Sequence, residues 1–283
     1  RSGSVTGVQT CALPIWRWQK DQAQLASGYV RSWPHYEALK RSVQRFKVPR
    51  PTQVPRFAGG RWFRTFVPKD ATQAQVVTSD VPNGPGRVLF DPAGERPESP
   101  PYVSWISPSP DGCTLAVGVC ADASENNTVR LIDVATGQHL PDAPQQIVMD
   151  SWSGGAQWLA DSSGFFFTGL KGHAHAFEQA VFFHRLGKPA TLEPEPIPIP
   201  ADSRDWRLVT VSREGRWAVA AHGMLSPQPV AVRDLSDPRG EWRPFMTEKL
   251  GTVAGQVFGN RYFAVTKDRK STRLNSSHRT GSR

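Results

Sequence analysis

Pairs of tight-turn residues recur along the chain at a nearly constant interval, and this recurrence restricts the fold more than any other feature of the sequence. The pairs are Gly59-Gly60, Asp111-Gly112, Ser163-Gly164, Glu214-Gly215 and Gly259-Asn260. Their spacings are 52, 52, 51 and 45 residues. Short strands that repeat roughly every 40–50 residues are typical of β-propeller blades. A β-sandwich also has short strands, but it needs no constant interval, so the repeat favours the propeller.

Each turn pair is followed by two segments that have the composition of strands. The first segments read RWFRTF, CTLAVGV, FFFTGL, RWAVAAH and RYFAVT, and the second segments read QAQVVTSD, TVRLIDV, QAVFFHRL and PVAVRDL. Leu115, Val117 and Val119 alternate with small residues, which is the period of two that a sheet requires. The sequence therefore predicts an all-β fold over residues 54–267, an incomplete β-propeller of about four to five blades.

The residues before the repeat are expected to form a short helical arm, residues 16–53, with a helical pattern over 16–47. Apolar side chains three or four positions apart fall on one helix face, and they are Tyr36, Leu39, Val43 and Phe46. Pro34 suits the first turn of this helix. Three later prolines end it, namely Pro49, Pro51 and Pro55.

Both ends of the chain are expected to be foreign to the native protein. The strings VTGVQTCALPI (5–15) and DRKSTRLNSSH (268–278) are translations of one DNA sequence and of its reverse complement, and that DNA resembles a short-read sequencing adapter. Unrelated protein segments do not share this relation by chance. Residues 1–15 and 268–283 are therefore set aside as adapter-derived, and the chain is expected to be a fragment whose native part runs from Trp16 to Lys267.

The charge of the chain does not predict a nucleic-acid partner. Of the formal net charge of +9, +1 lies in residues 1–15 and +4 in residues 268–283, which leaves +4 for residues 16–267 and no basic stripe. No apolar run approaches the roughly 18 residues of a membrane span, so we expect no membrane partner. The compartment stays open, with the cytoplasm favoured over the periplasm.

The chain has ten tryptophans, and aromatic side chains can form a stacking platform for single-stranded nucleic acid or sugar, which is a second binding hypothesis. They recur about once per blade, close to the turns, at Trp62, Trp105, Trp158 and Trp217. This regularity favours packing within the blades over a stacking platform. A proline-rich run at 193–202 is interpreted as a stiff connection between blades, with a polyproline ligand as the alternative.

The motifs of an enzyme centre are missing from the sequence. It has no Gly-x-Ser-x-Gly nucleophile turn, no glycine-rich phosphate loop and no His-Glu-x-x-His. We therefore predict no catalytic residue, no cofactor-binding residue and no cofactor for this chain. Asp111, Asp133 and Asp234 are interpreted as turn formers whose carboxylates accept hydrogen bonds from nearby backbone amides.

One cluster has the composition of a metal site. His173, His175 and Glu178 lie in the loop GLKGHAHAFEQ, and a His-x-His pair on a strand shares a face that binds zinc together with a carboxylate. No further firm ligand is evident, so a solvated loop is favoured and the metal site is kept as an alternative. Cys113 and Cys120 are an odd number of residues apart in one expected strand, so they face opposite ways and form no disulfide.

With the blades laid out, the chain resembles the amino-terminal half of the prolyl oligopeptidase family of serine peptidases. The resemblance covers residues 16–267. It rests on WQKDQAQLASGYV (18–30), GGRWFRTF (59–66), RVLFDP (87–92), SPSPDG (107–112), VRLIDVATGQHLPD (129–142), WLADSSGFFFT (158–168), VFFHRLGK (181–188) and YFAVTKD (262–268).

The resemblance implies a seven-bladed propeller that covers an α/β-hydrolase domain built mostly from chain downstream of it. It implies that the propeller admits only short peptides, which are the expected partners, and that the catalytic Ser, Asp and His lie downstream. The parent protein is then a serine-type oligopeptidase, and this chain alone is inactive. Two alternatives remain for the function: the propeller of a non-enzymatic binding or scaffold protein, and a propeller-type glycosidase. The cleavage specificity of the parent peptidase, after proline or after basic residues, also stays open.

Overall fold

The structure is a computed structural model, and it divides the chain into two units, Arg1–Pro49 and Arg50–Arg283, which are described separately here. It describes residues 8–46, 50–51, 54–69, 71–122, 126–146, 148–149, 155–170, 179–189, 193–198, 207–223, 227–246, 252–266 and 278–279.

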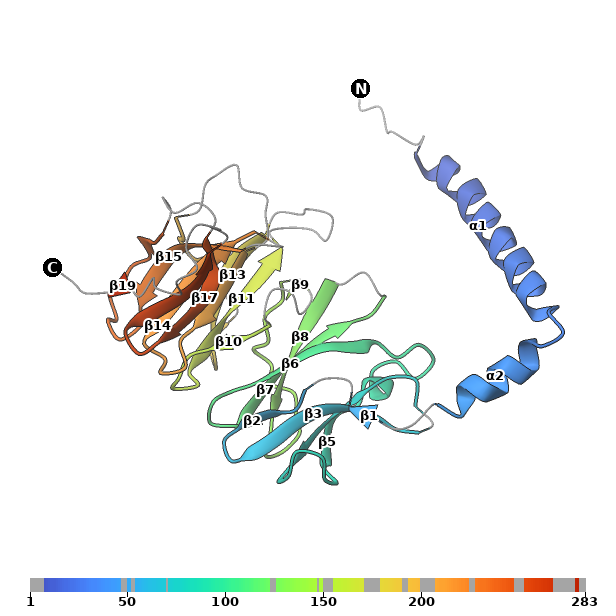
Figure 1. The fold of residues 1–283 in the computed structure, drawn as a ribbon, viewed down its shortest axis with the longest axis horizontal. Helices are drawn as coiled ribbons and strands as arrows, with labels where there is room; N and C mark the ends of the chain where they lie inside the picture. Colours follow the sequence, from blue (N-terminus) through green and yellow to red (C-terminus); the bar gives the residue numbers. More distant parts are fainter. Residues whose placement is uncertain are drawn as a thin grey trace. The chain divides into compact units, whose positions relative to one another are not determined.

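The first unit contains the helices α1 (Val8–Arg31) and α2 (Tyr36–Gln44) (Figure 1). The backbone N–H of Ser32 bonds to the Gly28 carbonyl at 3.0 Å, and the Ser32 hydroxyl bonds to the Tyr29 carbonyl at 2.7 Å, which closes the end of α1. Among the described residues no helix is long and apolar enough to cross a membrane.

The helical pattern expected over 16–47 differs from these helices at both ends. Helix α1 begins at Val8, eight residues earlier than expected. Helix α2 ends at Gln44, and Pro34 precedes its N-cap residue, His35. The predicted apolar stripe is present but exposed, since Leu39 and Val43 keep more than half of their surface in contact with solvent (53% and 57%).

The second unit begins with an antiparallel sheet in which β3 lies between β4 and a bent edge formed by β1 and β2. Its elements are β1 (Arg50–Pro51), β2 (Arg56–Ala58), β3 (Arg61–Val67), β4 (Gln75–Ser79), β5 (Arg87–Phe90) and the short 3-10 helix at Pro92–Gly94. Because β1 pairs with β3 through Arg50 and Val67, the sheet unit starts at residue 50 rather than at the expected residue 54.

The next two blades share one sheet. Their strands are β6 (Tyr102–Pro108), β7 (Thr114–Cys120), β8 (Asn126–Asp133), β9 (Val148–Met149), β10 (Gln157–Trp158), β11 (Gly164–Leu170) and β12 (Gln179–Arg185). Strand β9 pairs with β8 through Asn127 and Val148, and it also pairs with β11 through Val148 and Gly169. It therefore joins the two blades by backbone hydrogen bonds.

Two further sheets follow. Their strands are β13 (Arg207–Val211), β14 (Trp217–His222), β15 (Gln228–Asp234), β16 (Arg243–Pro244), β17 (Thr252–Phe258), β18 (Arg261–Thr266) and β19 (His278–Arg279). Strand β19 comes from the residues beyond 267, and its His278 pairs with Tyr262 of β18.

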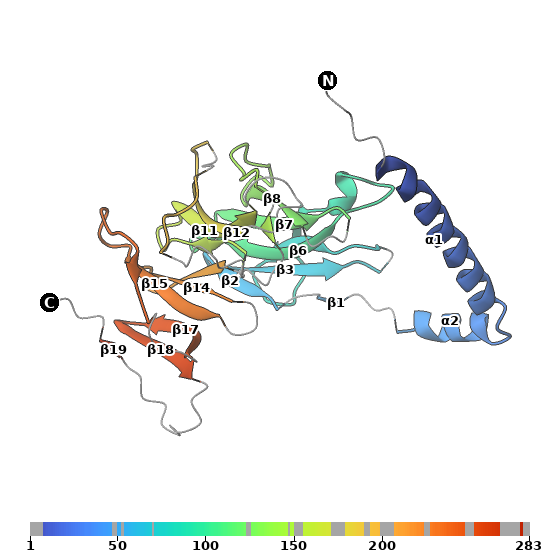
Figure 2. The same cartoon turned by 90° about the horizontal axis from the view of Figure 1, so that it is seen from above.

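The sheets contact one another in chain order, with β3 against β6, β11 against β13, and β15 against β17. Figure 2 shows β3 beside β6. The predicted fold class, a partial β-propeller with a helical arm, is confirmed.

The core lies between successive sheets. One cluster joins the first sheet to the second blade, and it includes Phe63, Val76, Ile106, Leu115, Val117 and Val119. Ala116 points the other way and belongs to the next cluster, together with Trp105 and Phe165. The period of two in this strand thus places alternate residues in two different cores, as the sequence predicted.

Candidate functional site

The three aspartates interpreted as turn formers have that role. Backbone N–H groups two or three residues further on donate to their Oδ1 atoms: Cys113 to Asp111 at 2.9 Å, Thr136 to Asp133 at 2.7 Å, and Ser236 to Asp234 at 3.0 Å. The bonds from Thr136 lower the pKa of Asp133, and the bonds from Arg216 lower the pKa of Asp234. These carboxylates therefore stabilise the turns in which they lie.

The turn of the third blade lies two residues earlier than predicted, at Asp161-Ser162 instead of Ser163-Gly164. Asp161 accepts from the Ser163 N–H at 3.0 Å, and Ser162 takes the left-handed backbone conformation with φ of 60°. Gly164 is instead the first residue of β11. The alignment of ADSS with PDGC would have placed this turn, but a serine in the glycine position is not a usual turn signal.

Successive turns contact one another across the blade boundaries. The Gly59 N–H donates to the Pro110 carbonyl at 3.1 Å, and the Asp111 N–H donates to the Ser162 hydroxyl at 3.1 Å. The Gly259 N–H donates to Glu214 Oε1 at 3.3 Å. A Cβ atom at Gly59 would lie 1.9 Å from the Asp111 carbonyl oxygen, so only glycine allows this approach.

The recurrent tryptophans pack into the blades, as predicted. Trp105, Trp158 and Trp217 are buried, while Trp62 is half-buried against Phe57. Two of them also bond to a neighbouring blade. The Trp158 indole N–H donates to the Ser107 carbonyl at 3.0 Å, and the Trp217 indole donates to the Asn260 side chain at 3.3 Å.

The candidate metal ligands His173, His175 and Glu178 lie outside the described residues. Within the described part of the chain, no group of three His, Cys, Asp or Glu side chains has the arrangement of a metal site. Cys113 and Cys120 are both free thiols; Cys120 is buried, whereas Cys113 is exposed and directly precedes β7.

A buried histidine pairs with a carboxylate, which the sequence did not single out. His184 Nε2 lies 3.2 Å from Asp142 Oδ2, and the same oxygen accepts from the Gly187 N–H at 2.6 Å. Burial lowers the pKa of His184, and Asp142 opposes this only in part. His184 Nδ1 has no hydrogen-bond partner among the described groups, so no hydroxyl nucleophile completes a triad there. The pair ties β12 to the segment after β8.

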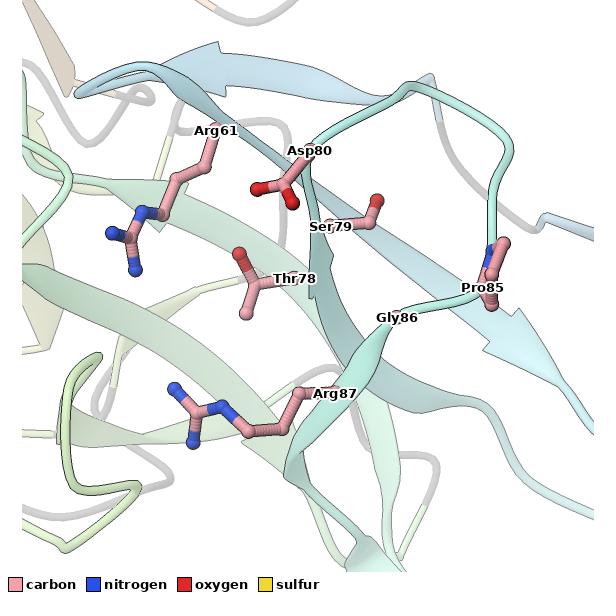
Figure 3. A pocket seen from close by; sticks show the side chains of 7 residues that line it. All are labelled: Arg61, Thr78, Ser79, Asp80, Pro85, Gly86 and Arg87. Atoms are coloured by element: carbon pink, nitrogen blue, oxygen red, sulfur yellow. The ribbon is translucent and has the colours of Figure 1, made fainter.

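A cavity of about 510 Å³ opens where β3, β4 and β5 meet their connecting loops (Figure 3). It is lined by Arg61, Thr78, Ser79, Asp80, Pro85, Gly86 and Arg87. The Arg87 guanidinium also donates to the Val134 carbonyl, so the cavity lies at the boundary of the first and second blades. Six of its lining residues come from the β4–β5 hairpin, and strand register places Arg61 of β3 beside them.

A second cavity, of about 460 Å³, lies beside β11, β12 and β15. Glu195, from the proline-rich run, lines it and accepts from the Trp242 indole at 2.8 Å and from Arg233 Nη1 at 3.0 Å. The Glu195 N–H donates to the carbonyl of Val181 in β12 at 2.8 Å. Glu195 and Arg233 are thus paired with each other in this cavity, and the proline-rich run connects blades as predicted.

Repeated antiparallel sheets, packed face to face in chain order and linked turn to turn, define a β-propeller protein. The chain belongs to the family described as prolyl oligopeptidase, N-terminal beta-propeller domain, whose model matches residues 16–274. This is the family that the sequence motifs indicated, and it is a family of serine peptidases.

Solved structures agree with this assignment at the level of the fold. A structure from an analysis of two prolyl endopeptidases is 18% identical with a TM-score of 0.70, and the match covers 90% of this chain and 38% of that one. Prolyl oligopeptidase B from Galerina marginata, bound to a 25mer macrocyclization substrate, is 16% identical with a TM-score of 0.70, and the match covers 89% of this chain and 39% of that one. A search of curated proteins gives no match.

Proposed function

We propose that the protein containing this propeller hydrolyses short peptides, and that the propeller restricts which molecules reach a separate catalytic domain. The observation that carries the proposal is the family match over residues 16–274. The chain spans 38% of the length of the similar prolyl endopeptidase structure, which leaves room in such a protein for a second domain. Acyl transfer through Ser, His and Asp is the chemistry proposed for that domain.

The physical basis of the restriction is the stiffness of the blade stack. Close-packed cores fill the space between sheets, and hydrogen bonds join successive turns, so neighbouring blades separate only at a cost in buried surface and in bonds. A flexible short peptide can adjust its own conformation to pass such a rigid blade stack, whereas a folded protein cannot. Size selection then requires no specific contact with the substrate.

The first experiment compares this chain with the complete protein encoded by its source gene. We expect no hydrolysis of fluorogenic peptides by the chain alone. We expect the complete protein to cleave short peptides carrying proline or arginine before the cleaved bond, with turnover abolished by a fluorophosphonate. A complete protein that neither turns over peptides nor reacts with the fluorophosphonate would support the scaffold alternative.

A second experiment addresses the restriction itself. In the complete protein, Gly59→Ala forces a Cβ against the next blade, while Gly60→Ala, in the same turn and also at positive φ, meets no atom within 4 Å. We expect Gly59→Ala to raise kcat/KM for long peptides relative to short ones, and Gly60→Ala to leave that ratio unchanged. Equal ratios in both variants and in the unaltered protein would refute the gating role.

A further inference from the structure

The cavity in Figure 3 is built by the register of three neighbouring strands. Thr78 of β4 is paired with Arg87 of β5 on one side and with Phe63 of β3 on the other. Arg61 lies two residues before Phe63, so its side chain projects from the same face of the sheet. Phe63 itself is fully buried in the core shared with the second blade. The three side chains of Arg61, Thr78 and Arg87 thus gather at the outer end of a packed boundary.

The hydroxyl of Thr78 is the unusual group in this cavity. Only 7% of the residue is exposed, and its Oγ1 has no hydrogen-bond partner. Buried hydroxyls in folded proteins are nearly always paired, because burial without a partner is unfavourable. Figure 3 shows the Thr78 side chain between those of Arg61 and Arg87. An unpaired donor placed between two cations is the arrangement that an anion satisfies.

The charges of the cavity also favour the binding of an anion. Arg61 has no ion-pair or hydrogen-bond partner within the described part of the chain, and Arg87 uses one N–H for the Val134 carbonyl, which leaves others for a ligand. Asp80 also lines the cavity and reduces its positive charge. Asp133 lies near enough to Arg87 for the charge of the arginine to lower the pKa of the aspartate, but its Oδ1 already accepts two bonds from Thr136.

We propose that this cavity binds a compact oxyanion, a carboxylate or a phosphate, held by the guanidinium groups of Arg61 and Arg87 and by the hydroxyl of Thr78. Planar guanidinium groups present paired N–H donors that match two oxygens of such an anion. A cation is excluded by the two arginines. Asp80 disfavours a doubly charged anion more than a singly charged one, whereas the two arginines favour it more, so the titration with both anions decides between a carboxylate and dianionic phosphate.

The test titrates the full chain with sodium phosphate and, separately, with sodium acetate, at constant ionic strength kept by sodium chloride. Binding is followed by isothermal titration calorimetry and by the melting temperature. We expect saturable binding of at least one of the two anions, and their relative affinities separate a carboxylate site from a phosphate site. A melting temperature that changes without saturation, or equally with added chloride, would overturn the proposal.

Two variants and a control locate the binding in this cavity. Arg61→Gln should raise the anion Kd about tenfold, because a charge-assisted bond is lost. Asp80→Asn should lower the Kd severalfold, because a like charge is removed from the cavity. Arg96→Gln removes an exposed arginine outside the cavity and should leave the Kd unchanged. An Arg61→Gln chain that binds as tightly as the unaltered one would refute the site.

Thr78→Val separates binding from folding. It keeps the volume of the side chain and removes the unpaired hydroxyl, so the melting temperature without anion should stay the same or rise, while the anion Kd should rise severalfold. A fall in the anion-free melting temperature would mean that the hydroxyl already has a structural partner. That result would overturn the proposal even if Arg61→Gln weakened binding.

Discussion

At Ser162 two effects act on one residue. Its left-handed backbone, with φ of 60°, is unfavourable by about 1–2 kcal/mol for a residue with a side chain. Its hydroxyl accepts the hydrogen bond from the Asp111 N–H and so joins the second blade to the third. The serine is buried, with 6% of its surface exposed, so water does not replace this acceptor.

Substitutions at Ser162 separate these two effects. Ser162→Ala keeps the backbone strain and removes the acceptor, so we expect the free energy of unfolding to fall by about 1–3 kcal/mol. Ser162→Gly also removes the acceptor but relieves the strain, so it should be more stable than the alanine variant by about 1 kcal/mol. Urea denaturation measures both. If alanine is as stable as glycine here, the left-handed conformation is not strained.

Single residues differ in how far their roles could be predicted. Asp111, Asp133 and Asp234 act within three residues of their own position, so their roles were readable from the local sequence. The role of Ser162 was not, because serine seldom adopts a left-handed conformation and its partner is 51 residues away. His184 and Asp142 likewise meet only through the tertiary fold.

At the scale of elements, the proline-rich run acts as a connecting segment through one side chain. Glu195 has 15% of its side chain exposed, and it accepts from Arg233 of β15 and from the indole of Trp242 next to β16. Without this carboxylate, two donors at the boundary of the third and fourth blades would lose their acceptor.

We therefore expect Glu195→Ala to lower the free energy of unfolding by about 2 kcal/mol, since it leaves a partly buried cation and an indole N–H unpaired. Glu195→Gln should recover part of the loss, because its amide oxygen still accepts from the indole. The matched control is Glu193→Ala in the same run, where the side chain is exposed and the expected change is within about 0.5 kcal/mol. Denaturation followed by tryptophan fluorescence measures all three; equal losses at both glutamates would contradict the assigned role of Glu195.

Strand pattern was the part of the fold that the sequence predicted best, because each blade strand has a period of two. Several strands were not singled out in the sequence, and for two of them the physical reason is clear. Strand β1 at Arg50–Pro51 lies among prolines that signal a break, and it is defined only by its pairing with β3. Strand β9 is two residues long, and its partners β8 and β11 belong to different blades.

At the scale of the whole molecule, the number of blades followed from turn spacing, but the cavity of Arg61, Thr78 and Arg87 did not. Those residues are brought together by the register of β3, β4 and β5, and register is set by many weak contacts rather than by a motif.

The hairpin β17–β18 has an exposed apolar face. Phe258, Phe263 and Val265 share one face of it and are 66%, 54% and 62% exposed.

Such an apolar sheet face promotes association. We expect the purified chain to form concentration-dependent oligomers, and we expect Phe263→Lys combined with Val265→Lys to reduce them, because charged side chains on this face are unfavourable to bury against another molecule. Val81→Lys, at an exposed position after β4, serves as the control and should leave association unchanged. Sedimentation velocity reports the oligomers. A monomeric unaltered chain at high concentration would contradict this expectation.

Strand β9 has a mechanical consequence for the blade stack. Between the second and third blades, parting the sheets requires β9 to lose its backbone bonds to β8 or to β11. At the other boundaries of the described sheets, no strand is shared, and the contacts are made by side chains and turns. We therefore expect these two blades to separate less readily than any other neighbouring pair in the described stack.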